Sequence, residues 1–135
     1  VTMAKSWEKY GIHALESVYP IVGPGFESIQ NIGDKNRNIV HLKHTEGIDI
    51  NIANISDMLG GFGLISLMGT KGGIQIKSTD TYYAFKKQLQ SYVNYLQTGQ
   101  KPVPWNETYE LMQLVSAGIE SREKGGIKIT LNKDK

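Results

Sequence analysis

The sequence predicts an α+β domain, in which a mostly antiparallel, open-faced sheet carries helices packed on one face. Apolar residues recur first at helical spacing, then alternate as in strands, and finally return to helical spacing in two long segments. The connections within the strand region are short, which indicates antiparallel pairing, because parallel strands need a crossover of about a dozen residues. Strands and helices segregated along the chain in this way are typical of α+β domains.

The first expected element is a short helix from about residue 10 to residue 19. At 100° per residue, its apolar side chains share one side of the helix, namely Ile12, Leu15, Val18 and Tyr19. The opposite side carries polar side chains, namely Lys9, His13, Glu16 and Ser17. Because Pro20 lacks a backbone donor, we expect the helix to end or kink close to it.

A run of strands is expected between residues 26 and 77. The clearest alternation covers residues 48–53, where three isoleucines repeat at every second position, as in a strand with one buried face. Turn signals separate the strands at residues 33–36, at Glu46-Gly47 and at residues 71–73.

Two helices and a last strand complete the expected order. The first helix covers about residues 82–96, and Gly99 ends it. The second runs from about Asn106 to Lys124 and ends at a pair of glycines. A short alternating strand is expected at residues 127–131.

The composition indicates one domain, spanning residues 1–135. With 39% apolar and 21% charged residues the chain is expected to bury a core, and the lack of cysteine excludes disulfides and thiolate sites. The formal net charge is only +2 and no basic stripe is interleaved with aromatic residues, so we expect no nucleic-acid partner. No apolar run is long enough to span a membrane, so we expect no membrane partner.

The start of the chain, Val1-Thr2-Met3, is not a normal initiation sequence. We therefore expect the chain to be a fragment of a longer protein. The missing signal peptide then says little about the location of that longer protein. A cytoplasmic location is favoured, and an exported full-length protein stays open.

Two kinds of site are not expected in this chain. A dinucleotide-binding loop needs G-x-G-x-x-G between a strand and a helix, and neither Gly23-Pro24-Gly25 nor residues 60–63 fit that pattern, so we expect no cofactor-binding residues. His41 and His44 are three residues apart on an expected strand and should point to opposite faces, so no metal site is expected there.

Lys9, His13 and Glu16 form the one polar group that resembles a site. Spacings of four and three residues bring them together on one helix surface. A histidine beside an ammonium and a carboxylate can donate or accept protons near neutral pH. The same spacing also fits an ordinary exposed helix face with salt bridges, so spacing alone leaves both interpretations open.

Two stretches carry a resemblance to a known family. The first is Gly11-Ile12-His13-Ala14-Leu15-Glu16, and the second runs from residue 83 to residue 131 and contains Tyr92-Val93-Asn94-Tyr95-Leu96-Gln97-Thr98-Gly99 and Ala117-Gly118-Ile119-Glu120-Ser121. The first resembles the G-x-H-x-x-[DE] motif that opens the C-terminal domain of the glucose–fructose oxidoreductase and inositol dehydrogenase (Gfo/Idh/MocA) family. The second resembles the closing pair of helices of that domain. Together they span nearly the whole chain.

The resemblance implies the substrate-side domain of an oxidoreductase that uses NAD or NADP and acts on a sugar, polyol or derivative. It implies that an N-terminal nucleotide-binding domain, absent from this chain, is the partner that holds the cofactor, so the chain alone is expected to be inactive. It gives His13 the role of the catalytic histidine that transfers a proton. It also implies a homo-oligomer that assembles through the sheet.

One position departs from the family pattern. The family commonly has D-x-x-x-H, and here Lys9 stands four residues before His13. An aspartate would orient the imidazole and stabilise its charged form, whereas a lysine repels that form. We expect Lys9 to bind an anionic or multiply hydroxylated substrate instead. The departure also leaves an alternative open, a non-catalytic binding or assembly module with the same fold.

Overall fold

The computed structural model describes residues 1–59, 63–77 and 79–131, and it confirms the α+β class. In chain order the elements are β1 (Thr2–Ala4), α1 (Trp7–Val22), β2 (Phe26–Asn31), β3 (Arg37–His44), β4 (Asp49–Ile55), β5 (Leu64–Gly69), β6 (Gly72–Lys77), α2 (Thr81–Thr98), α3 (Trp105–Glu123) and β7 (Ile129–Thr130).

Five strands form the main sheet, in the order β1-β4-β3-β2-β7. Its pairs are antiparallel except for β1, which runs parallel to β4 with Thr2 opposite Ala53 and Ala4 opposite Ile55. Periodicity does not predict β1, because three residues are too few to show an alternation. Its parallel pairing is possible because α1, β2 and β3 together form the long crossover that such pairing needs.

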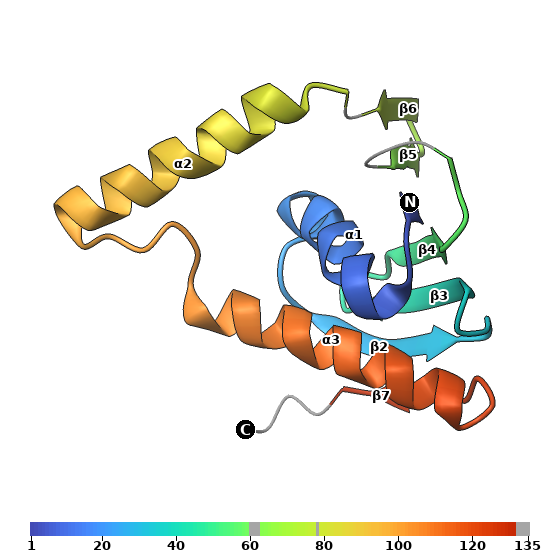
Figure 1. Ribbon diagram of the computed structural model, residues 1–135. Coiled ribbons are helices and arrows are strands. Elements are labelled where there is room, and N and C mark those ends of the chain that lie inside the picture. Colours follow the sequence, from blue (N-terminus) through green and yellow to red (C-terminus); the bar gives the residue numbers. More distant parts are fainter. Residues whose placement is uncertain (60–62, 78, 132–135) are drawn as a thin grey trace.

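Helices α1 and α3 lie against one face of this sheet and bury the core with it (Figure 1). Trp7 sits between the two helices: its side chain is fully buried, and its Nε1 donates a hydrogen bond to the carbonyl oxygen of Val115 at 2.9 Å. A Cβ at Gly11 or at Gly118 would lie 2.7 Å from the Trp7 ring. The helix pair therefore depends on one aromatic side chain and on two positions that have no side chain.

Helix α1 begins three residues earlier than the sequence pattern predicts, with Ser6 as its N-cap residue. The Ser6 carbonyl oxygen accepts the backbone N–H groups of Lys9 and Tyr10. Pro20 lies inside the last turn, and the helix continues for two residues beyond it to Val22. The expected helix end near Pro20 is therefore close to the observed one, since a proline in the last turn removes only one hydrogen bond.

The separate hairpin and the second helix depart from the expected arrangement. Among the residues that the structure describes, strands β5 and β6 pair only with each other, as a two-stranded sheet. Helix α2 forms where the periodicity predicts it, but no residue of α2 is buried, and the helix stands away from the main sheet (Figure 1). Among the described residues, α1 and α3 alone cover the sheet. The expected apolar stripe of α2 is exposed, namely Tyr82, Phe85, Leu89, Val93 and Leu96.

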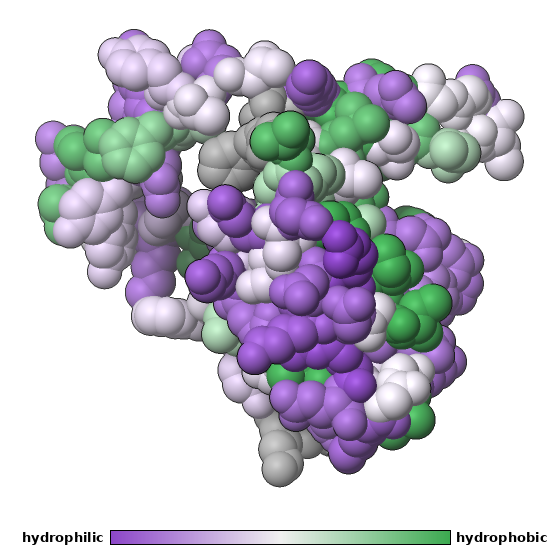
Figure 2. Space-filling view, turned by 45° about the vertical axis from the view of Figure 1, so that its right-hand side comes forward, coloured by the Kyte–Doolittle hydropathy of each residue, from purple (hydrophilic) through white to green (hydrophobic). Residues whose placement is uncertain are grey.

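The surface of the molecule is mixed. Hydrophilic side chains dominate the centre of the main body in the view of Figure 2, and hydrophobic side chains lie on its right flank and, among hydrophilic ones, on the parts that project at the top. On an amphipathic helix such as α2, an apolar stripe about 100° wide normally faces a core. The described chain contains no surface that covers it.

The face of the main sheet opposite the helices is mixed in character. His41 Nε2 and Lys43 Nζ each lie 2.9 Å from a carboxylate oxygen of Asp49. The hydrogen bond from Lys43, and then that from His41, hold the pKa of Asp49 below its usual value. Ile39 is 42% exposed on the same face. The open face thus combines a charged network with an apolar side chain.

Candidate functional site

The candidate site lies on the exposed face of α1. Ala14, Leu15 and Val18 pack into the core and fix how the helix is rotated against the sheet. Because helical residues repeat every 3.6 positions, burying these side chains turns His13 and Glu16 toward solvent. The structure therefore confirms the predicted placement of His13 on the outer side of the helix.

A charged contact ties the start of α1 to α3. The Glu8 carboxylate accepts a hydrogen bond of 2.6 Å from Arg122 Nη2, and Arg122 Nη1 donates to Asn38 Oδ1 at 2.8 Å. Burial alone would raise the pKa of Glu8, but its hydrogen bond with Arg122 and the charge of that guanidinium outweigh burial and lower it. The contact holds the first turn of α1, from which the polar face continues toward His13.

His13 and Glu16 form a hydrogen-bonded pair. Nδ1 of His13 lies 2.9 Å from Oε2 of Glu16, and the two side chains are 44% and 53% exposed. A carboxylate can only accept, so Nδ1 carries the proton in this contact. The neutral ring then has its lone pair on Nε2. Glu16 thus sets the tautomer in which Nε2 can take a proton.

Tyr10 provides a second contact to the imidazole. The two rings meet edge to face, with centroids 5.1 Å apart and planes inclined by 71°. Tyr10 is half-buried and packs against the core cluster. The histidine ring is therefore held between a carboxylate at i+3 and an aromatic ring at i−3.

Lys9 lies one helical turn before His13, and its side chain is exposed. No carboxylate lies within ion-pair distance of its ammonium in the part of the chain that the structure describes. The structure thus brings Lys9 and His13 onto one face, as the spacing predicts, and pairs Glu16 with His13 rather than with Lys9.

Spacing leaves the partner of Glu16 unassigned. Its position three residues after His13 brings its carboxylate near the imidazole ring, but the Lys9 side chain also reaches that helix face. The sequence alone therefore does not tell whether Glu16 pairs with His13 or with Lys9. In the structure the partner of Glu16 is His13, whose Nδ1 its carboxylate contacts.

The other sequence candidates do not join this face. His41 lies on the open face of the sheet, whereas His44 is buried on the opposite face, where Nε2 contacts the carbonyl oxygen of Pro24 at 3.0 Å. The turn at Gly23-Pro24-Gly25 leads into β2 and not into a helix. Within the described ranges, no group of three metal-ligating side chains occurs and no helix is long and apolar enough to cross a membrane. Residues 60–62 lie outside them.

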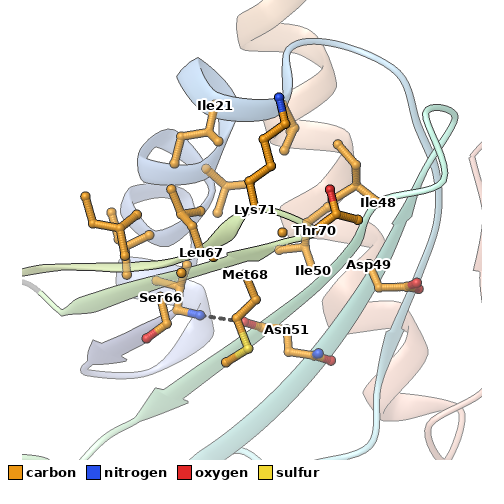
Figure 3. Close-up of a pocket in the computed structure, with 18 residues that line it drawn as sticks. Ile21, Ile48, Asp49, Ile50, Asn51, Ser66, Leu67, Met68, Thr70 and Lys71 are labelled. Carbon is orange, nitrogen blue, oxygen red and sulfur yellow. Dashed lines mark hydrogen bonds between the residues drawn. The ribbon is translucent and has the colours of Figure 1, made fainter.

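A hollow of about 960 Å³ lies elsewhere on the molecule (Figure 3). The hairpin β5–β6, the C-terminal end of α1 and the start of β4 form its walls. Neither Lys9 nor His13 lines it. The candidate site is therefore an exposed helix face, which needs a second body to enclose a small molecule.

Comparisons with known proteins agree with this geometry at the level of the fold. Neither models of protein families nor curated proteins match the sequence. The myo-inositol dehydrogenase of Corynebacterium glutamicum matches 97% of this chain with 54% of its own, at 19% identity and a TM-score of 0.74. That of Lactobacillus casei, in complex with NAD(H) and myo-inositol, matches 99% with 53%, at 14% identity and a TM-score of 0.78. The chain has the fold of a Gfo/Idh/MocA C-terminal domain.

A third solved structure extends the comparison. GenD2 from gentamicin A biosynthesis, in complex with NAD, matches 97% of this chain with 54% of its own, at 14% identity and a TM-score of 0.76. The chain spans about half the length of these three proteins. Within the Gfo/Idh/MocA fold, the stretches that carry the sequence resemblance fall on α1, α2 and α3.

Proposed function

We propose that this chain is the substrate-side domain of a nicotinamide-dependent oxidoreductase that acts on a sugar, a polyol or a derivative. The observation that carries the proposal is the His13–Glu16 pair on the exposed face of α1, in a fold shared with a myo-inositol dehydrogenase in complex with NAD(H) and with GenD2 in complex with NAD. A polyhydroxylated substrate suits a face that offers an imidazole and an ammonium.

His13 acts as the general base toward a substrate hydroxyl. Its Nε2 lone pair accepts the hydroxyl proton while the carbinol carbon becomes a carbonyl carbon, and Nε2–H returns the proton in the reverse direction. Glu16 is a positioning residue: its carboxylate accepts the hydrogen bond from Nδ1–H and so fixes the orientation and the tautomer of the ring.

Lys9 contributes substrate affinity. An ammonium can donate three hydrogen bonds, so it can bind several hydroxyls or an anionic group of the substrate. Lys9 and Glu16 place opposite charges on the face that carries His13, and the Glu16 carboxylate is the one that contacts the ring directly. The departure from the family's aspartate is therefore compatible with catalysis.

The described residues do not form a dinucleotide cradle, because no glycine loop leads into the N-terminus of a helix. Hydride acceptance would be supplied by a nicotinamide, NAD or NADP, held by an N-terminal domain in the half that the dehydrogenases above have and this chain lacks. The share of this chain is to bind the substrate, to orient its hydroxyl and to move one proton.

The test is steady-state kinetics of the full-length protein with NAD and NADP on a panel of polyols and sugars. Replacing His13 by alanine should lower kcat by about a hundredfold or more, typical of losing a general acid–base group. The melting temperature should hardly change, because the side chain is 44% exposed. Lys9→Ala should raise KM and leave kcat within a fewfold. Normal turnover by the His13→Ala protein would leave the non-catalytic binding or assembly module as the better interpretation.

We also infer that the full-length protein is a homo-oligomer that pairs through the open face of the main sheet. The exposed side chain of Ile39 on that face supports this inference. Light scattering should give a dimer or larger, and Ile39→Lys should dissociate it. Met112→Lys is the matched control, since Met112 is 52% exposed on α3. A monomer at high concentration would contradict the inference.

A further inference from the structure

The apolar hollow lies between the main sheet and the hairpin β5–β6. Figure 3 shows the hairpin on one side of it and β4 on the other, with Ile21 of α1 at its end. Branched aliphatic side chains line it from all of these elements, among them Val18, Ile21, Ile50, Ile65, Leu67 and Ile74. Apolar walls facing an open space cost free energy in water, so the hollow is a place that another apolar segment would cover.

Half of the outer edge of β4 has no strand partner among the described residues. Strand β1 pairs with residues 53–55 of β4, and the backbone of Val1 extends the ladder by one residue. The Val1 nitrogen donates to the Asn51 carbonyl oxygen at 2.6 Å, and the Val1 carbonyl oxygen accepts from Ala53 N–H at 2.8 Å. Val1 therefore stands opposite Ile52 in parallel register, at the border of the hollow.

The same register fixes where a preceding chain would run. In a parallel ladder, each bonding residue joins two residues of its neighbour that are two positions apart, as Val1 joins Asn51 and Ala53. The residue two positions before Val1 would then donate to the Asp49 carbonyl oxygen and accept from Asn51 N–H. Both groups point outward, because alternate residues of β4 point to β3.

The facing edge of β5 also lacks a strand partner among the described residues. One hydrogen bond links this edge to the main sheet, from Leu64 N–H to Thr2 Oγ1 at 3.3 Å. Beyond it, β5 pairs only with β6, and side chains of both strands face the hollow. One added β-strand would hydrogen-bond to these strand edges and cover the apolar hollow between them.

We propose that the chain preceding Val1 in the full-length protein continues β1 along the free edge of β4 and fills this hollow. The inference rests on the proposed function, which supplies a preceding domain. The added strand covers the apolar walls and joins the hairpin to the main sheet. Because β1 leads into α1 through only two residues, it also connects the cofactor-holding domain directly to the helix that carries His13.

A preceding segment fits better than a strand from a second copy. Val1 already pairs with β4 in the required register. The residues that precede Val1 in the same chain are therefore directed along Asn51 and Asp49 by this pairing alone. A strand from another molecule would have to begin where the Val1 backbone already lies. The second copy is thus one outcome of the test.

Hydrogen exchange resolved by residue tests the proposal in this 135-residue chain and in the full-length protein. The amide of Asn51 should exchange at least about a hundredfold more slowly in the full-length protein, since a ladder bond opens only with its strand. The amide of Ile50, which faces β3, is the matched control and should be protected in both. Equal exchange of the Asn51 amide in both proteins would overturn the proposal. Protection that appears in the short chain only as its concentration rises would overturn it in favour of a second copy.

A substitution gives an independent readout. Asn51→Pro removes only the outward N–H, which an edge strand tolerates, so the short chain should keep its melting temperature. In the full-length protein it should lower the melting temperature by about 2–4 °C, as expected for one lost ladder bond. Asn51→Ala keeps the backbone N–H, so it should change the melting temperature of the short chain and of the full-length protein equally. Equal effects of Asn51→Pro on the two proteins would contradict the added strand, whatever the kinetics of the His13→Ala protein show.

Discussion

Replacing Glu16 separates an orienting role from a structural one. The Glu16–His13 contact joins two side chains that are about half exposed, so solvent screens it, and its loss should cost only about 0.2–1 kcal/mol of unfolding free energy. In the full-length protein, Glu16→Ala should nevertheless lower kcat by about 10- to 100-fold, because the imidazole loses the acceptor that fixes its tautomer. KM should change little, since Glu16 does not bind the substrate in this scheme.

A graded series of variants makes the assay specific. Glu16→Gln keeps an acceptor oxygen without the charge, so it should recover part of the lost turnover, and Glu16→Asp tests whether a shorter carboxylate still reaches Nδ1. Urea unfolding of the same proteins provides the stability control. The reasoning is refuted if Glu16→Ala lowers turnover no more than it lowers the folded fraction, or if KM rises while kcat is unchanged.

Two further predictions concern the scaffold that holds this face. Trp7→Ala should lower the free energy of unfolding by about 3–5 kcal/mol in urea. The substitution empties a fully buried site and leaves the Val115 carbonyl oxygen without its donor. A loss below about 1 kcal/mol would mean that the two helices close on the space between Gly11 and Gly118. The pKa of Glu8 is lowered in the folded state from its ordinary value of 4.5. Its contact with Arg122 therefore stabilises the folded protein at a pH above 4.5, and this stabilisation is lost as the pH falls through the lowered pKa. The melting temperature should therefore drop as the pH falls below 4.5, and less so in Glu8→Gln. Equal drops in both proteins would show that the contact contributes nothing.

Periodicity predicts elements well where a segment is long and one-sided. The face of α1 that carries His13 was predictable, because the apolar side chains opposite to it had to be buried. The same rule predicts α2 as a helix and identifies its stripe, but it cannot say what covers that stripe. Strand β1 escapes prediction because it is short and pairs with residues 51 positions further along the chain.

Buried polar residues mark the limit of pattern reasoning. Asn31, Asn38 and Asn54 are all fully buried on the helix side of the sheet, where an alternation rule expects apolar side chains. Asn31 Nδ2 donates to Asn38 Oδ1 at 2.9 Å, whereas no group of the described residues pairs with the side chain of Asn54. Such positions depend on contacts between distant segments, which a linear sequence does not display.

The exposed second helix has a thermodynamic consequence. The chain exposes 9093 Å², whereas a compact monomer of 15.0 kDa exposes about 7000 Å². Both the heat-capacity increment of unfolding and the denaturant m-value scale with the surface that unfolding newly exposes. A chain that already exposes about 2000 Å² more than its mass requires should therefore unfold with a smaller heat-capacity increment and a shallower urea transition than other domains of its length. The 18 residues of α2 would add little to either quantity until a neighbouring surface covers them.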